Sequence, residues 1–415
     1  MQSTDNKLLP RLSSDIDHDS NKIIDFFVKM LRINSVNPSM GGPGETERAA
    51  FIQSYLKNEG FEVIRVDAPD ANYKDKVRPN IYAKLEGIDR SKTLWFLAHM
   101  DTVPEGAREL WQTDPFDPVI KDGKIFARGA EDNGQSLVAS LFALRELKLL
   151  GEKLPFNVGT WCVADEEFGS QYGAKYLLEH NFFRPNDLIV VPDAGVPDGR
   201  NIEIAEKNLL WLKFTVKGKQ VHASLPSKGK NAHRIGMRLS LELDRILHEN
   251  YTKRNDLFDE PGSTFEPTKV EANVPNINTI PGIDVFCFDC RVIPEYSLDN
   301  VLSDIERTIQ YYRSSFNAEI SLEIVNREDA GPATATTSEV SKLLEKAVRQ
   351  VAKKEPRFVG IGGQTVGNLF RKQGLATAVW STVDDLPHEP NEYSRIQNLI
   401  SDTKVFAAMP LLAGS

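Results

Sequence analysis

Residues that can bind a metal ion occur where apolar segments of this 415-residue sequence end. The clearest case is the apolar run 94–98, which stops at His99 and is followed by Asp101. If this run is a buried strand, the imidazole and the carboxylate emerge at a sheet edge on the same side of the chain. A metal commonly takes one ring nitrogen of such a histidine, while a carboxylate fixes the other nitrogen. The stretch 93–102 therefore predicts one corner of a metal site.

Five further residues have side chains suited to the same site, namely Asp132, Glu166, Glu167, Asp193 and His388. Each also has an ordinary interpretation. Asp132 could cap a helix, Asp193 could be a turn residue, and the acidic triplet 165–167 could be a solvated loop. His388 could lie in a surface loop. Position favours the metal site, because most of these residues follow an apolar run directly.

Helical segments alternate with the apolar runs. The spacing of apolar residues predicts helices over 20–35, 47–60, 135–149 and 170–179, between apolar strands such as 156–163 and 187–192. This alternation indicates an α/β domain with a mostly parallel sheet. Such sheets bind ligands beyond the carboxyl ends of their strands. Three of the strands end in acids or in His99, so we expect these side chains to meet at one edge.

The pattern changes near residue 208. From there the order strand, helix, strand, strand, helix, strand suggests a small α+β sandwich with one exposed sheet face. From about residue 338 the parallel-sheet pattern returns. The sequence therefore predicts a catalytic domain in two parts, 1–207 and 328–415, that is interrupted by an inserted domain over 208–327.

Composition excludes several classes of protein. A formal net charge of -9 without a basic stripe argues against nucleic acid as a partner. No run approaches the roughly 20 apolar residues of a membrane span. Three cysteines suit a reducing compartment. Cys287 and Cys290 form a C-x-x-C, but in a strand their side chains point to opposite faces, which disfavours a zinc or redox motif. We expect a cytoplasmic protein without membrane or nucleic-acid partners.

The motifs, taken in order, resemble a known family. His-x-Asp, a Gly-x-x-Asp turn, Glu-Glu, an Asp after a strand and a late His are similar to the co-catalytic di-zinc amidohydrolases and metallopeptidases. That family includes acetylornithine deacetylase, succinyl-diaminopimelate desuccinylase, aminoacylase and carboxypeptidase G. The resemblance covers nearly the whole chain. It implies an α/β catalytic domain of the zinc-peptidase type and an inserted ferredoxin-like lid and dimerisation domain.

The resemblance also implies the metal ligands. His99 and Asp193 would hold one zinc ion, Glu167 and His388 the other, and Asp132 would bridge them. Mixed imidazole and carboxylate ligands suit zinc, although cobalt or manganese could substitute. Two zinc ions carry four positive charges and the three carboxylates remove three, which leaves one for an anionic ligand.

The catalytic roles follow from the same resemblance. Glu166 would be the general base that takes a proton from water and returns it to the leaving amine, a role that typically contributes about 10²–10⁴-fold. Asp101 would orient His99. His222 matches the lid histidine that polarises the scissile carbonyl, from the partner subunit in dimeric members. The Asp132–Asn133 peptide bond would be cis.

Substrate contacts are implied at four positions, Asn278, Arg291, Gly362 and Gly363. An arginine can bind a substrate carboxylate with two hydrogen bonds, and glycines allow close approach of the backbone. Two segments depart from the family pattern: Asn-Gly-Gln at 133–135, where Lys-Gly is frequent, and Gln-Thr at 364–365. We expect neither departure to touch a metal ligand, and both bear on the substrate.

The sequence thus predicts hydrolysis of an amide bond adjacent to a carboxylate. The first choice is deacylation of an N-acyl amino acid, as in succinyl-diaminopimelate desuccinylase or acetylornithine deacetylase. The alternative is a dipeptidase or carboxypeptidase, and a third is a non-catalytic metal-binding scaffold. A homodimer through the lid domain is expected, because an unprotected edge strand invites pairing.

Overall fold

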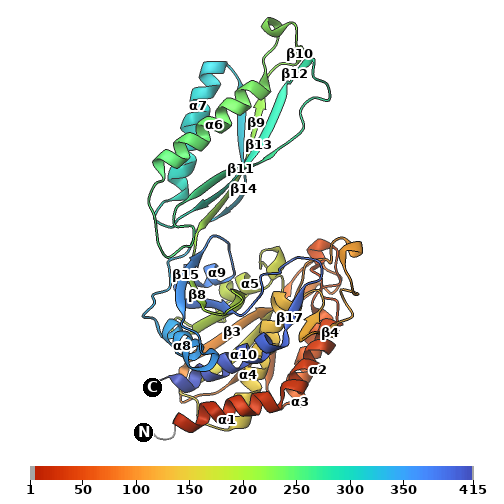
Figure 1. Cartoon of the computed structure of the whole chain (residues 1–415), viewed down its shortest axis with the longest axis vertical. Coiled ribbons are helices and arrows are strands. Elements are labelled where there is room, and N and C mark those ends of the chain that lie inside the picture. The colour runs from red at the N-terminus through yellow and green to blue at the C-terminus, as the bar shows by residue number, and fades with distance from the viewer. Residues whose placement is uncertain (1–4, 414–415) are drawn as a thin grey trace. The chain divides into compact units, whose positions relative to one another are not determined.

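The computed structural model describes residues 5–413 and divides into two compact units. Unit 1 comprises Met1–Ile204, Ala333–Phe358 and Thr365–Ser415, and unit 2 comprises Ala205–Pro332 and Val359–Gln364. The short segment Val359–Gln364 thus belongs with unit 2, although the sequence analysis placed it in the second part of the catalytic domain. Figure 1 shows the course of the chain from end to end.

Unit 1 is built on an eight-stranded sheet with the order β1-β2-β6-β3-β7-β16-β8-β15. The strands are β1 Val63–Pro69, β2 Val77–Leu85, β6 Phe156–Val163, β3 Asp89–His99, β7 Leu188–Gly195, β16 Ala376–Ser381, β8 Asn201–Glu206 and β15 Arg357–Ile361. The four central strands, from β6 to β16, are parallel, whereas β1, β2 and β8 pair antiparallel. The predicted α/β class with a mostly parallel sheet is confirmed. The register places Leu94 of β3 opposite both Val158 and Leu188, so three strands of the site run side by side.

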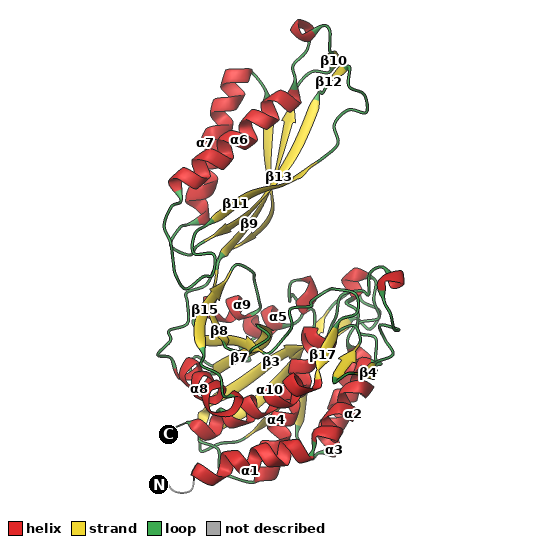
Figure 2. Ribbon diagram, in the orientation of Figure 1, coloured by secondary structure: helices red, strands yellow, loops and turns green. Residues whose placement is uncertain are grey.

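Helices cover both faces of this sheet (Figure 2). They are α1 Asp5–His18, α2 Ser20–Leu31, α3 Thr46–Asn58, α4 Ser136–Leu150, α5 Ala174–Glu179, α8 Glu339–Ala347, α9 Gly367–Lys372 and α10 Ile396–Ala408. Helices α4 and α10 pack together on one face, and α5 and α9 lie against the other. Strand β3 packs against both layers: Phe96 contacts Phe406 of α10 with 4.9 Å between ring centroids, while Trp95 and Leu97 pack with Phe370 of α9. This two-sided burial explains the uninterrupted apolar run before His99.

The sequence pattern does not predict α1. Pro10 lies inside it, and its apolar residues are few, yet Leu12 and Ile16 are buried one turn apart. The helix packs against α4 and α10. Its stability therefore depends on these tertiary contacts rather than on a strong local pattern.

Unit 2 is an α+β sandwich. Its four antiparallel strands have the order β11-β13-β9-β14. Its elements are β9 Asn208–Lys217, β10 Val221–His222, α6 Ala232–Asn250, β11 Thr264–Val270, β12 Thr279–Ile280, β13 Ile283–Val292, α7 Leu298–Phe316 and β14 Glu319–Glu328. The main elements follow one another along the chain as βαββαβ, and with this strand order they form the ferredoxin-like arrangement that the family resemblance predicted.

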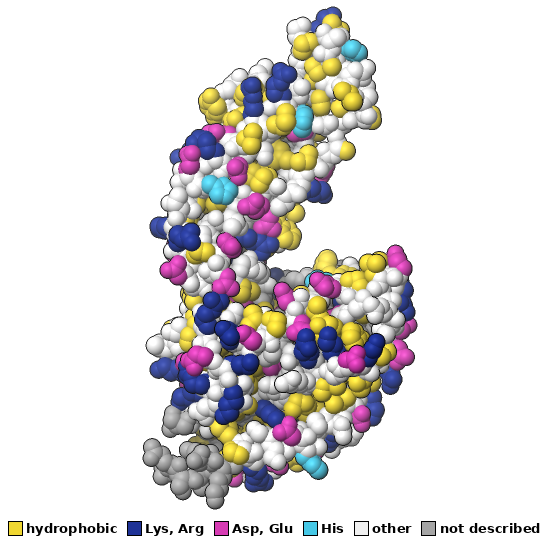
Figure 3. All heavy atoms as spheres, in the orientation of Figure 1, with side chains coloured by type: hydrophobic (Ala, Val, Ile, Leu, Met, Phe, Trp, Pro, Cys, Tyr) yellow, Lys and Arg dark blue, Asp and Glu magenta, His cyan; other side chains and the backbone are white. Residues whose placement is uncertain are grey.

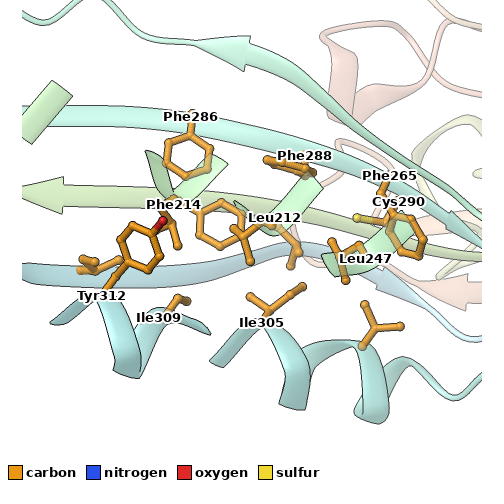
Figure 4. Packing of buried hydrophobic residues seen from close by; sticks show 14 of the residues in the cluster. Leu212, Phe214, Leu247, Phe265, Phe286, Phe288, Cys290, Ile305, Ile309 and Tyr312 are labelled. Carbon is orange, nitrogen blue, oxygen red and sulfur yellow. The ribbon is translucent and has the colours of Figure 1, made fainter. Parts of the chain in front are cut away.

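Both helices of unit 2 bury one face of its sheet (Figure 4). Phe214 and Phe286 stack with 4.8 Å between centroids, and Ile305 and Ile309 of α7 belong to the same core. Full burial of each such side chain contributes about 1.5–3 kcal/mol. Cys290 lies in this core, whereas Cys287 is half-buried on the opposite face, as the odd spacing predicted.

The surface carries both signs of charge. On the face drawn in Figure 3, Lys and Arg side chains are interspersed with Asp and Glu side chains. Among the described residues, no helix is both long enough and apolar enough to cross a membrane.

Candidate metal centre

Five chain segments bring the predicted metal-binding residues together at the carboxyl ends of the central strands. His99 is the last residue of β3 and is buried. Glu166 and Glu167 begin a 3₁₀ turn just after β6, and Asp193 lies near the end of β7. Because β6, β3 and β7 are adjacent parallel strands, their ends meet at one sheet edge.

The remaining two residues come from irregular backbone. Asp132 lies in the turn Ala130–Gln135 between β5 (Lys124–Phe126) and α4, and its peptide bond to Asn133 is cis, as the resemblance predicted. His388 lies in the loop between β16 and β17 (Tyr393–Arg395) with a φ of 65°. Strand β17 pairs with β5, and β5 with β4 (Val119–Lys121), so this small sheet joins the two segments.

Asp132 is shared between two groups of side chains. Its Oδ1 lies 2.9 Å from His99 Nε2, and its Oδ2 lies 3.5 Å from His388 Nε2. His99 Nε2 is also 3.4 Å from Asp193 Oδ1, and His388 Nε2 is 3.0 Å from Glu167 Oε2. The five residues therefore form two clusters, each with one imidazole, that meet at one carboxylate.

The base candidate Glu166 lies beside the first cluster. Its Oε2 is 4.0 Å from His99 Nε2, and it groups with His99 and Asp193 at metal-binding distances. Burial and then the charge of Asp193 raise the pKa of Glu166 well above its ordinary value. The carboxylates are thus crowded enough that they repel one another.

The histidines experience the same negative potential. Hydrogen bonds to Asp132 and Glu167 raise the pKa of His388 to about 10. Burial acts to lower the pKa of His99, but the carboxylates of Asp101, Asp132 and Asp193 outweigh it and raise that pKa well above its ordinary value. A site that stabilises positive charge so strongly suits cations.

The donors fit a pair of divalent metal ions. Two imidazole nitrogens and several carboxylate oxygens are the ligands that zinc takes, and cobalt and manganese accept them too. His99 Nδ1 is 2.9 Å from the carbonyl oxygen of Asp101, which fixes the tautomer and leaves Nε2 for a metal.

Asp101 contacts more than His99. Its carboxylate is 3.5 Å from His99 Nδ1, but it accepts closer hydrogen bonds from the backbone N–H of Glu166 and Glu167. Its Oδ2 also accepts a 2.7 Å bond from Asn37 Nδ2. Asp101 was expected to orient the imidazole of His99, and it contacts that ring chiefly through its backbone carbonyl.

One expectation was wrong. Asn133 does touch a predicted ligand, because its Nδ2 donates to Asp193 Oδ1 at 2.6 Å. Gln135, in the same departure from the family pattern, is buried and donates to Asp402 Oδ2 at 3.1 Å. The side chains of Asn133 and Gln135 thus support the site from inside unit 1. In the second departure from the family pattern, the side-chain amide of Gln364 donates to the backbone carbonyl of Lys207, and both residues belong to unit 2.

The predicted residues of unit 2 form two separate groups. His222 of β10 is opposite Thr279 of β12, and Ala223 N–H donates to the carbonyl of Asn278, so His222 and Asn278 are neighbours. Arg291 Nη1 donates to the Gly362 carbonyl at 2.9 Å. Strand β13 separates the two groups, since it starts at Ile283 and reaches Arg291 roughly 26 Å further on at about 3.3 Å per residue.

Arg291 is already engaged. Its Nε and Nη2 donate to the two oxygens of Asp289 at 2.6 and 3.0 Å, and Trp211 Nε1 donates to the same carboxylate. Gly363, next to Gly362, lies in the same Val359–Gln364 segment. A ligand carboxylate at Arg291 must therefore compete with Asp289.

Sequence reasoning missed two glutamates and an asparagine in this centre. Glu131 and Glu392 lie close to Asp132 and His388 in the sequence, and their carboxylates accept hydrogen bonds from backbone N–H groups. Asn37, in a loop after α2, donates hydrogen bonds to Asp101 and Asp165 and belongs to none of the motifs. Proximity to the ligands was the one available signal for the glutamates.

Comparisons with known proteins agree with this geometry. Residues 95–411 match Peptidase family M20/M25/M40. The chain is 40% identical over 394 residues to an uncharacterized metallohydrolase of Methanocaldococcus jannaschii, covering 91% of this chain and 96% of that protein. It is 26% identical over 390 residues to a succinyl-diaminopimelate desuccinylase of a Sulfurovum species, covering 92% and 97%.

Solved structures share the fold. Human carnosine dipeptidase 1 superposes with a TM-score of 0.72 at 19% identity, covering 97% of this chain and 98% of that one. A dinuclear metal-binding M20 peptidase of Bacillus subtilis gives 0.65 at 12% identity, covering 95% and 98%. The family suggested by the order of the motifs is confirmed: this chain belongs to Peptidase family M20/M25/M40 and is a metal-dependent hydrolase.

Proposed function

We propose that this protein uses two zinc ions to hydrolyse an amide bond adjacent to a carboxylate, and that its substrates are N-acyl amino acids. The observation that carries the proposal is the position of Asp132, whose two oxygens face the two imidazoles from opposite clusters. His99 and Asp193 would hold one ion, and Glu167 and His388 the other. The substrate class is supported by the similarity to a succinyl-diaminopimelate desuccinylase.

When bound, the two ions would polarise the amide carbonyl and lower the pKa of water. Glu166 takes a proton from the attacking water and returns it to the leaving amine nitrogen. Its backbone N–H is held by Asp101, so the carboxylate is directed from a fixed turn. Positioning of this kind is what an efficient general base requires.

The test is a substrate panel on protein loaded with Zn²⁺. N-succinyl-diaminopimelate, N-acetylornithine and a set of dipeptides are compared by kcat/KM, with protein stripped by a chelator as the control. We expect the acyl amino acids to be cleaved and the stripped protein to be inactive. Rapid cleavage of dipeptides without any deacylation would replace the deacylase by a dipeptidase or carboxypeptidase. Metal binding without any turnover would favour a non-catalytic scaffold.

We further propose that the protein is a homodimer in which unit 2 contributes to the partner's site. His222 and Arg291 lie at opposite ends of β13, so one small substrate cannot contact both within one copy. Strand β14 is a sheet edge where Ile324 and Val325 are 46% and 54% exposed, which suits pairing with a second copy.

A complementation experiment tests this assembly. His222→Ala and Glu166→Gln proteins are each inactive on our proposal, and mixing them restores activity if His222 of the partner subunit completes the site. Mixed protein that stays inactive, with sedimentation at the mass of a monomer, would refute the dimer.

The cytoplasmic location that we propose is supported by three free cysteines, Cys162, Cys287 and Cys290.

A further inference from the structure

Two segments of unit 1 hold each other through buried glutamates. Glu392 reaches into the turn before α4: its Oε2 accepts the N–H of Gly129 at 2.9 Å, and its Oε1 accepts those of Glu131 at 2.8 Å and Asp132 at 3.0 Å. The Glu392 carboxylate therefore organises the backbone of the residue that bridges the two clusters.

The contact is reciprocal. Glu131 Oε1 accepts the N–H of Asp384, and its Oε2 accepts that of Leu386, each at 2.6 Å. These two amides lie in the loop that leads to His388. Each segment thus supplies a carboxylate to the backbone of the other, and we call Glu131 and Glu392 together the carboxylate clasp.

A buried cation balances half of the clasp. Arg128 Nη1 donates to Glu392 Oε2 at 2.7 Å, and its Nη2 donates to the carbonyl of His388 at 3.3 Å. Arg128 and Glu392 are each 1% exposed. Since the ion pair and five backbone donors engage every oxygen of the two carboxylates, the backbone on both sides has little freedom to move.

The clasp acts unequally on the two clusters. It fixes the segments of Asp132 and His388, which are two of the three ligands of the second cluster. The first cluster keeps His99 and Asp193, which stand on β3 and β7. We propose that Glu131 and Glu392 are positioning residues that set the affinity for the metal ion at His388 and Glu167 while affecting the other ion less. This inference rests on the proposed di-metal function.

The substitution Glu392→Gln tests the clasp with little change in volume. The amide keeps one acceptor oxygen, but its NH₂ faces a backbone N–H or Arg128, which repels it. Groups that support metal ligands typically change metal affinity by about 10–100-fold when they are replaced. We expect the affinity for the ion at His388 and Glu167 to fall by that factor, and the affinity for the other ion to fall less. Glu131→Gln, made from the opposite segment, should weaken the same ion.

Asp187→Asn is a matched control. Asp187 is 2% exposed and accepts hydrogen bonds from the N–H of Thr93 and Arg184 and from Trp95 Nε1. It lies before β7, at the opposite ends of β3 and β7 from the metal-binding residues. The Asp187→Asn variant should have a lower thermal stability, and its affinity for one ion should not fall more than its affinity for the other.

The measurements are competitive Zn²⁺ titration against a chromophoric chelator and the absorption spectrum of protein titrated with Co²⁺. The proposal is supported if wild type binds two ions while Glu392→Gln and Glu131→Gln bind one with near wild-type affinity and one more weakly, with a matching change in the Co²⁺ spectrum. It is overturned if either variant binds both ions as wild type does, or if Asp187→Asn shows the same selective loss. Failure of wild type to bind two ions would instead refute the proposed function and the clasp with it.

Discussion

Asp101 holds the backbone of Glu166: its Oδ1 accepts the Glu166 N–H at 3.0 Å, closer than its 3.5 Å approach to His99 Nδ1. The other oxygen accepts the N–H of Glu167 at 3.2 Å. The turn that carries both glutamates starts from Asp165 in a left-handed conformation, with a φ of 62°. A carboxylate that bonds two successive amides keeps that turn in place. Asp101 therefore links the strand end at His99 to the position of Glu166, the proposed base.

Asp101→Asn should slow turnover more than it weakens metal binding. An amide at this position can accept from one of the two N–H groups and not from both, so the Glu166 turn loosens. We expect kcat to fall about 10–100-fold, a size usual for groups that support a metal site. Steady-state kinetics with metal content measured on the same samples provide the check. Loss of zinc with normal kcat at saturating zinc would show that Asp101 acts through His99 instead.

Glu166→Gln should remove most activity while the metal remains. The side chain keeps its size but cannot take a proton from water, so we expect kcat to fall by about 10²–10⁴-fold. Elemental analysis should still find the metal content of wild type, because the five proposed ligands are untouched. Unchanged turnover would exclude Glu166 as the base. The substitution Glu339→Gln, at an exposed position, is a suitable control.

Arg78→Met should destabilise unit 1. Arg78 is fully buried, bonds Glu45 with Nε at 2.8 Å, and lies 3.4 Å from Asp165. Loss of the cation leaves these acids buried without a cationic partner, which typically costs about 3–5 kcal/mol. The urea midpoint, followed by tryptophan fluorescence, measures this loss. Arg90→Met is the control, since its pair with Glu86 is exposed and such pairs contribute about 0–1 kcal/mol.

Asp402 should make stability fall as the pH rises. Burial raises its pKa from 3.8 to about 7, although hydrogen bonds from Thr382 and Gln135 oppose the shift. Between pH 4 and 7 the folded state therefore keeps a proton that the unfolded state has lost, so unfolding becomes easier towards neutral pH. Asp402→Asn mimics the protonated acid and should remove this effect.

The check is a series of melting temperatures from pH 5 to pH 8. Relative to wild type, Asp402→Asn should become progressively more stable across the series, by up to a few kcal/mol at the upper end. The substitution Asp117→Asn, at an exposed position, is the control. Parallel curves for wild type and Asp402→Asn would contradict the prediction.

The strand ends were the most predictable part of the centre. A run such as 94–98 must be buried on both faces, and parallel strands leave their ligands at one edge, so His99, Glu167 and Asp193 could be expected to meet. Asp132 and His388 depended on the resemblance to a family, because irregular turns have no periodicity to read.

The supporting residues were not predictable in the same way. Glu392 and Asn37 act through backbone N–H groups, and the direction of a backbone N–H depends on turn geometry that composition does not reveal. Asn133 was expected not to touch a metal ligand and instead bonds Asp193. Helix α1 was missed because its burial depends on α4 and α10, which lie far along the sequence.

The clasp joins residues that are 260 positions apart, from Asp132 to Glu392. A ribosome makes the chain from the N-terminus, so the segment of Asp132 emerges long before the segment that fixes it. Unit 2 is synthesised in between. The nascent chain can thus present His99 and Asp193 early, but the second cluster is completed only after the segment of His388 and Glu392 has emerged. On the proposed di-metal function, binding of the second ion therefore has to await that later segment.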